Sequence, residues 1–257
     1  MSTDERLRPY PAVSRTERVG SVATIRVVYD VVLRQLVSTA RIVALVLLSL
    51  TTTIAGFAIG TSDSASITDA AGMIGNLGLA VVVPVVALVF AGAALGDLRE
   101  DKTLVYLWLR PLPRLPIVVG AALAALTLVV PVAVPPVVLG AALTGAGEGI
   151  VGATALATLV AAVAYVGIFT LFGVWLRRYI VWGLGYILIW EGFIALGGAG
   201  VAQFAIRKYT RSILADITGA DLRLADFNTA TGVVVPLLVA VAALAIASWR
   251  LGRQDID

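Results

Sequence analysis

Residues 96–116 read GDLREDKTLVYLWLRPLPRLP, and long apolar runs lie on both sides of this stretch. Apolar runs of that length belong in lipid, so the charged stretch between them must lie outside the membrane. Glu100, Asp101 and Thr103 suit the start of a short helix, because acidic side chains are stabilised at the positive end of the helix dipole. The sequence therefore predicts that a helix begins here, at a membrane face.

The second half of the same stretch predicts the character and the end of that helix. Leu104, Leu107 and Trp108 recur at helical spacing and form an apolar stripe. The segment Arg110-Pro111-Leu112-Pro113 then ends the helix, because proline lacks the backbone donor and restricts the residue before it. Two interpretations are open: a solvated loop with an interfacial anchor, or a docking element for a soluble partner.

Composition places the chain in a membrane. Its 257 residues are 60% hydrophobic and 14% charged, with a mean hydropathy of +0.98. A soluble domain is about half apolar and about a quarter charged. The chain has no cysteine and no histidine, which excludes disulfides, thiolate chemistry and histidine bases or metal ligands. We expect no metal site, no catalytic residue and no nucleic-acid partner.

The first 40 residues differ from the rest of the chain. Residues 1–20 are polar and are interpreted as a cytoplasmic tail preceding a membrane domain at 21–257. In residues 22–37, apolar side chains at helical spacing alternate with Arg26, Asp30 and Arg34. This pattern favours a helix lying in the membrane interface, with basic side chains reaching toward headgroups. The alternative is a cytoplasmic extension of the first span.

Six apolar runs are long enough to cross a bilayer, since a span needs about 20 residues. We place the spans at about 42–60, 74–95, 117–143, 150–176, 179–198 and 232–249. The fold class is therefore an all-α membrane protein with six transmembrane helices, an N-terminal interfacial helix and a cytoplasmic helix between spans two and three.

The basic residues predict the orientation. Of the 19 lysines and arginines, 15 fall in the segment through Arg41, the 96–116 stretch, the Arg177-Arg178 turn and the C-terminal tail. Cytoplasmic loops carry an excess of such residues. We therefore expect a multi-pass protein of the cytoplasmic (inner) membrane, with both termini and the 96–116 stretch in the cytoplasm.

Three connections fall on the opposite, outer side. Residues 61–71 and 144–149 are predicted to be short turn-rich loops, and residues 199–231 a longer one. Within the last, Val201–Leu214 can form an amphipathic helix, which we expect at the outer surface or dipping partly into it. The three aspartates Asp216, Asp221 and Asp226 match no calcium loop and are interpreted as a solvated face.

Glu191 is an ionisable residue inside the predicted fifth span. A carboxylate in hydrocarbon costs at least a few kcal/mol, so we expect it to face protein or water and to have a partner. Two interpretations of Glu191 are open. Glu191 is a substrate or proton site, or it makes a structural hydrogen bond.

Prolines and glycines within the spans predict kinks and close packing. The prolines, which we expect to kink or interrupt helices, are Pro84, Pro131, Pro135, Pro136 and Pro236. The pairs Gly56/Gly60 and Gly92/Gly96 have the small-xxx-small spacing that lets membrane helices approach closely. The chain lacks a P-loop, a hydrolase elbow and a zinc motif, so energy for any work must come from elsewhere.

Together these elements resemble a permease subunit of the type-2 ABC transporter family, over essentially the whole chain. The most specific part is Glu100-Asp101-Lys102-Thr103-Leu104 followed by Leu109-Arg110-Pro111-Leu112-Pro113-Arg114, with Lys102 where the family usually has glycine. Trp190-Glu191-Gly192 is also similar to many members. The resemblance implies that this stretch is a coupling helix that docks on an ATP-binding subunit through Glu100, Asp101, Thr103, Leu104, Leu107, Trp108, Arg110 and Arg114.

The resemblance also implies the function: an exporter permease, working as a homodimer or heterodimer, with ATP and Mg bound by the partner subunit and no cofactor on this chain. The second and fifth spans would lie near the dimer axis, with Asn76, Pro84, Tyr186 and Glu191 as candidate pathway residues. Few polar groups in the spans favour a lipophilic cargo such as a drug, an antibiotic or a lipid. Membrane lipids are its other expected partners.

Two functions of other classes are alternatives to an exporter permease. One is an ABC-type membrane machine or scaffold acting on an outer-face client protein, as in the family branch dedicated to nitrous-oxide reductase maturation. The other is an intramembrane enzyme, which is disfavoured because no second carboxylate accompanies Glu191 within the spans.

Overall fold

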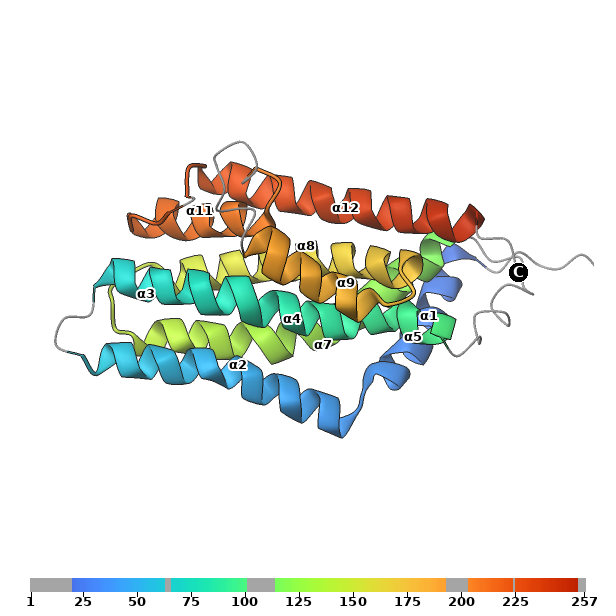
Figure 1. Ribbon diagram of the computed structural model, residues 1–257, viewed down its shortest axis with the longest axis horizontal. Helices are drawn as coiled ribbons and strands as arrows, with labels where there is room; N and C mark the ends of the chain where they lie inside the picture. The colour runs from blue at the N-terminus through green and yellow to red at the C-terminus, as the bar shows by residue number, and fades with distance from the viewer. Residues whose placement is uncertain (1–19, 63–65, 101–113, 193–202, 224, 254–257) are drawn as a thin grey trace, which may run out of the picture.

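The computed structural model describes residues 20–62, 66–100, 114–192, 203–223 and 225–253, with side chains omitted at 98–100, and all regular structure there is helical (Figure 1). The α-helices are α1 (Ser21–Leu36), α2 (Thr39–Gly60), α3 (Ile67–Met73), α4 (Val83–Ala87), α5 (Ala93–Glu100), α7 (Arg114–Leu143), α8 (Ile150–Trp175), α9 (Tyr179–Gly185), α11 (Ile206–Thr218) and α12 (Thr229–Arg253). Three π-helical segments continue these helices: η1 (Ile74–Val82), η2 (Leu88–Gly92) and η3 (Tyr186–Glu191).

Five helices of the described residues are long and apolar enough to cross a membrane, which makes the chain an all-α, multi-pass membrane protein. They are Thr39–Gly60, Ile67–Asp97, Arg114–Leu143, Ile150–Trp175 and Thr229–Arg253. They contain the predicted spans one, two, three, four (but for its last residue) and six. The predicted fifth span coincides with the shorter apolar helix Tyr179–Glu191, and its remainder lies mostly outside the described residues. At 1.5 Å per residue this helix covers about 20 Å of a core about 30 Å thick.

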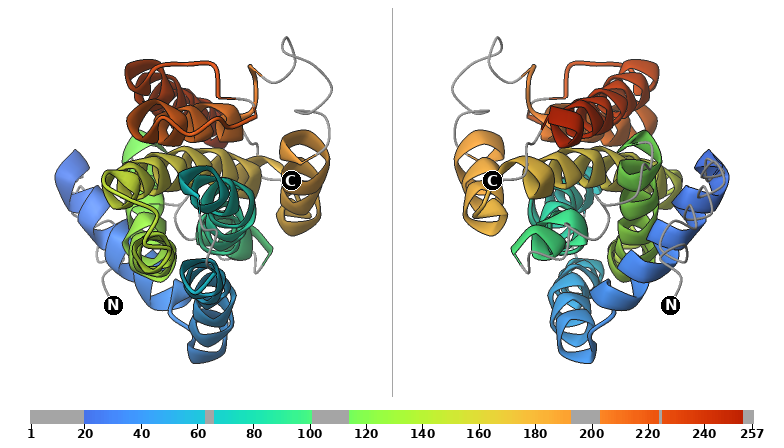
Figure 2. Two further views of the ribbon diagram at one scale, coloured as in Figure 1. Left: turned by 90° about the vertical axis from the view of Figure 1, so that its left-hand side faces the viewer. Right: turned by 90° about the vertical axis from the view of Figure 1, so that its right-hand side faces the viewer.

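The long helix Ile67–Asp97 occupies the centre of the bundle. Within its most apolar window, 78% of the residues are buried, against 22% for α2 and 28% for α12. Figure 2, viewed along the bundle, shows α11 and α12 on one side of it, α2 on the opposite side and α9 on the flank. The second predicted span is thus a core helix, whereas α2 and α12 present wide apolar faces outward.

The two ends of the bundle are named here after the helices that lie there. Figure 1 shows α1 beside the end of α5, the start of α7 and the last turns of α12, at the α1 end. The opposite, α11 end holds α11, the start of α3 and the start of α12. The described residues on either side of 101–113, the end of α5 and the start of α7, therefore both lie at the α1 end.

The N-terminal amphipathic helix is confirmed as a separate element. The extended residues Val37 and Ser38 separate α1 from α2, so α1 is not a continuation of the first span. Its buried residues Thr24, Val28, Val32 and Leu36 recur every four positions and form one stripe. The stripe packs on α7 beside Gly120, where an added Cβ would lie 2.8 Å from the Ile25 carbonyl oxygen.

The predicted close-packing glycines do bring helices together. A Cβ added at Gly56 would overlap the Gly140 carbonyl oxygen, and one at Gly60 would overlap the Leu143 carbonyl oxygen. No real Cβ fits so close to backbone, so a glycine of α2 lets the two helix backbones touch at both positions.

One expectation about a helix boundary was wrong, and the prolines expected to kink or interrupt helices cause no interruption in α7 or α12. The predicted loop 61–71 is shorter, because Ser66 and Asp69 form a capping box that starts α3 at Ile67: Ser66 Oγ accepts from the Asp69 N–H at 3.1 Å. The prolines in α7 and α12 do not interrupt those helices. Pro84 instead follows the wide turns of η1, which accommodate a ring that has no N–H to donate.

The amphipathic helix predicted over Val201–Leu214 begins later, at Ile206, and it packs against other helices; its place at the outer membrane surface stays a prediction. Residues 206–214 of α11 are all buried against α8, α12 and η1, whereas Phe204 stands exposed before the helix. Gly219, with φ of 69°, ends the helix by donating its N–H to the Ala215 carbonyl oxygen at 2.8 Å. The basic residues of this helix, Arg207, Lys208 and Arg211, are therefore buried inside the protein.

Candidate functional site

Glu191 lies at the junction of η3 and α11 and is 1% exposed. Its Oε1 accepts the Ile206 N–H at 2.9 Å, and its Oε2 accepts the Arg207 N–H at 3.1 Å. These two groups belong to the first turn of α11, which has no intrahelical partners for them and carries partial positive charge. Glu191 thus anchors the start of α11 across 15 residues of chain.

Aromatic hydroxyl groups complete the surroundings of this carboxylate. Tyr186 donates its hydroxyl to Glu191 Oε1 at 2.8 Å. The two residues are five positions apart on η3, and a π-helical turn brings such positions together. The fully buried Tyr165 of α8 lies near the same carboxylate, and Phe169 and Phe172 pack edge-on against the Tyr186 ring. The prediction that Glu191 faces protein and has partners is confirmed.

Two arginines of α11 converge on one side-chain amide. Arg207 donates from Nη2 to Asn76 Oδ1 at 2.7 Å, and Arg211 donates from Nη1 to the same oxygen at 3.3 Å. Both residues are buried, at 8% and 6% exposure. Burial, and then the neighbouring charge of Arg207, lower the pKa of Arg211 to about 10. Holding these like charges together is therefore costly.

The third basic residue of α11 has a different environment. Lys208 Nζ lies 2.8 Å from Asp226 Oδ2 and 5.0 Å from the centroid of the Phe227 ring, which itself stacks on Tyr209. Lys208 therefore has an acidic partner and an aromatic one. Asp226, expected to be merely solvated, ties the segment before α12 to α11.

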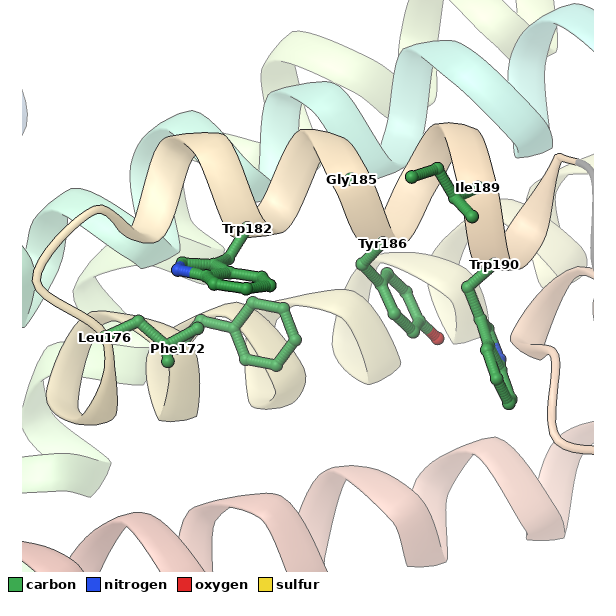
Figure 3. A pocket seen from close by; sticks show the side chains of 7 residues that line it. All are labelled: Phe172, Leu176, Trp182, Gly185, Tyr186, Ile189 and Trp190. Carbon is green, nitrogen blue, oxygen red and sulfur yellow. The ribbon is translucent and has the colours of Figure 1, made fainter.

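A mostly apolar cavity of about 310 Å³ lies between α8 and the α9–η3 helix. Figure 3 shows its lining: Phe172 and Leu176 from α8, with Trp182, Gly185, Tyr186, Ile189 and Trp190 from α9 and η3. Tyr186 also holds Glu191, so one side chain joins the wall of the cavity to the anchor of α11. Aromatic walls with few polar groups suit a lipophilic occupant.

A second polar cluster lies at the α1 end, around Asp97. Its Oδ1 accepts the Tyr179 hydroxyl at 2.7 Å, and its Oδ2 lies 3.4 Å from Arg41 Nη2. The Tyr179 ring occupies the notch made by Gly92 and Gly96, where a Cβ added at either glycine would overlap ring carbons. We call Arg41, Asp97 and Tyr179 the Asp97 clasp. It joins α2, α5 and α9 close to the end of α5, which directly precedes residues 101–113.

The structure brings together three of the four candidate pathway residues. Glu191 and Tyr186 are hydrogen-bonded, and Asn76 joins them through Arg207 of α11. Pro84 is buried in the core of the central helix and lies outside this cluster. Whether the three line a pathway stays a prediction.

The predicted coupling residues lie at or beyond the edge of the described region. Glu100 is the last residue of α5 and Arg114 the first of α7. The others fall outside the described residues: Asp101, Thr103, Leu104, Leu107, Trp108 and Arg110.

Sequence reasoning missed the partners of these residues. Arg207 and Arg211 are four positions apart, a spacing that places them on one helix face, but nothing in the sequence indicates that this face is buried. Asp97 lies in the charged stretch that follows the predicted second span, and Tyr179 lies at the start of the predicted fifth span. The available signal was the Gly92/Gly96 pair, which indicated close packing without naming the ring that fills the notch.

Comparisons of the chain with protein-family models, with curated proteins and with solved structures found no match. The fold and the site therefore define the protein at the level of its class, an all-α multi-pass membrane protein with five candidate spans in its described residues.

Proposed function

We propose that this chain is the transmembrane permease subunit of an ATP-driven ABC exporter that moves a lipophilic substrate with the help of a separate ATP-binding subunit. A separate amphipathic α1, apolar spanning helices and a charged segment between the second and third of them agree with the family that the sequence resembles. ATP and Mg²⁺ would be bound by the partner subunit, and a second permease copy would complete the assembly.

The observation that carries the proposal is the Asp97 clasp at the root of the 101–113 segment. Asp97 contacts Arg41 at the start of α2 and Tyr179 at the start of α9. A force applied by a bound ATPase to the 96–116 stretch would reach the central helix, α2 and α9 through these contacts. A loop that only anchored the protein in lipid would not need such a junction.

The proposed orientation puts the α1 end in the cytoplasm of a cell whose inner membrane holds the protein. The described elements that carry most basic residues meet there: α1, the start of α7, the Arg177-Arg178 turn and the end of α12. This clustering satisfies the positive-inside rule. Both termini would then be cytoplasmic.

The cargo proposal rests on the cavity and its neighbours. The aromatic cavity beside Tyr186 suits a drug, an antibiotic or a lipid better than a polar solute. We favour an exporter over a machine that acts on an outer-face client, because α11 has residues 206–214 buried and so offers few side chains to such a client.

The test is purification of the full-length chain in mild detergent from its native host, with identification of the chains that copurify and measurement of ATP hydrolysis. The proposal expects an ATP-binding subunit and ATPase activity that changes when lipophilic cargo is added. A chain that purifies without an ATPase, from cells that express the neighbouring genes, would contradict it.

A further inference from the structure

The arginine pair of α11 is the part of the molecule that the proposed function leaves unexplained. Arg207 and Arg211 lie one helical turn apart and share Asn76 Oδ1 as acceptor. The Nε atoms of both side chains are buried, and neither has a hydrogen-bond partner among the described residues. Buried donors without acceptors are costly, so this arrangement calls for a further group.

The charges around the pair do not balance. Glu191 acts electrostatically on Arg207, but its oxygens already accept two backbone N–H groups and a tyrosine hydroxyl. Within the described residues, neither arginine has an acidic oxygen within 4 Å. The stretch 193–202 that precedes α11 contains no acidic residue. Within the described residues, the two cations thus face one carboxylate, which already accepts three hydrogen bonds.

Lys208 shows that α11 can satisfy a buried cation when the chain supplies a partner. It is 2% exposed and lies against Asp226. The lack of such a partner at Arg207 and Arg211 is therefore local to one face of α11, the face toward η1.

The acceptor that the two arginines share lies at the surface of the described chain. Asn76, which accepts from both guanidinium groups, is itself exposed, so it lies between the buried arginines and the surface of the chain. The neighbouring Gly75 lets the Arg211 side chain pack close to η1, because an added Cβ there would lie 3.1 Å from Arg211 Nε.

We propose that Arg207 and Arg211 bind an anionic group, a phosphate or a carboxylate, that enters beside Asn76. The planar guanidinium fork matches both groups in a bidentate manner, and charge-assisted hydrogen bonds are the strong ones. The anion would supply acceptors for the unpartnered nitrogens and balance the second positive charge. Its source is either a lipid headgroup or a free anion. Anion binding at this site needs no ATPase partner, so its test is independent of the proposed function.

The test is thermal unfolding of the full-length protein in nanodiscs. One arm compares phosphatidylcholine discs with and without inorganic phosphate at constant ionic strength, and the other compares phosphatidylcholine discs with discs that also contain phosphatidylglycerol. At ten times the Kd, binding should raise the Tm by about 3 °C or more. A response to phosphate assigns a free anion, and a response to phosphatidylglycerol alone assigns a lipid headgroup.

Three variants make the test specific. The double variant Arg207→Gln with Arg211→Gln should lose the response, whereas Lys208→Gln, on the same helix, should keep it. Asn76→Asp places a carboxylate between the arginines, so it should raise the Tm without added anion and abolish the response even if the double variant does not fold. A wild-type protein that responds to neither probe, or a response that survives in the double variant or in Asn76→Asp, overturns the proposal, as does its equal loss in Lys208→Gln.

Discussion

Replacing Glu191 tests the account of how α11 is held. Glutamine keeps one acceptor oxygen but turns an amide NH2 toward at least one of the three donors that Glu191 now satisfies. A buried donor left without an acceptor costs about 1–3 kcal/mol. For a chain of this size that corresponds to roughly 2–12 °C in Tm. Alanine leaves all three donors unpaired and should cost two to three times as much.

The assay is thermal unfolding of the purified protein in detergent, followed by size-exclusion chromatography. The matched control is Asp216→Asn. Asp216 also holds the start of a helix, since its Oδ2 accepts the Thr229 N–H at 2.7 Å, but this carboxylate is exposed to solvent. Its loss should change the Tm little, because water replaces the acceptor. Values of Tm for Glu191→Gln and Glu191→Ala within about 1 °C of the wild type would refute the anchoring role. A fall in transport with an unchanged Tm would assign Glu191 to the pathway instead.

Three further predictions concern packing, the Asp97 clasp and topology. Gly56→Ala should destabilise the protein by about 1–3 kcal/mol through overpacking against α7, while Gly152→Ala, with open space around it, should be neutral or stabilising; equal effects would contradict the packing argument. Tyr179→Phe keeps the ring in its notch but removes the hydrogen bond to the carboxylate on α5, so it should cost about 1 kcal/mol in thermal unfolding, and an unchanged Tm would show that this bond does not stabilise the fold. Since the chain has no cysteine, single cysteines can be introduced directly: one at Thr218 should react with an impermeant thiol reagent in intact cells and one at Arg178 should not, and the reverse result would invert the proposed orientation.

The spanning helices were predictable from the sequence because the bilayer imposes both their length and their polarity. Predicted and observed helices agree for the regions that begin near Ile42, Ile117, Ile150 and Gly232. The amphipathic α1 was also predictable, because its stripe recurs every four residues. The need of Glu191 for partners followed from the cost of a carboxylate in an apolar run.

The partners themselves could not be predicted, because they depend on tertiary packing. The periodicity of α11 separates apolar from basic residues and so predicts a surface helix. The structure buries both faces because Glu191, Asn76 and Asp226 receive its polar groups. The π-helical turns have no sequence signal of their own beyond Pro84, which follows the first of them.

The central claim is that the 96–116 stretch couples a partner ATPase to the spans, and Trp108→Ala on the purified complex tests it most directly. A buried aromatic anchor contributes about 2 kcal/mol or more to an interface, or roughly 30-fold in affinity. Trp108→Ala should release the ATP-binding subunit, or leave it bound with hydrolysis no longer responsive to cargo. Glu100→Ala, at the rim, should have a milder and salt-sensitive effect. If Trp108→Ala leaves copurification and turnover unchanged, the stretch is an interfacial anchor, and the coupling assignment is wrong.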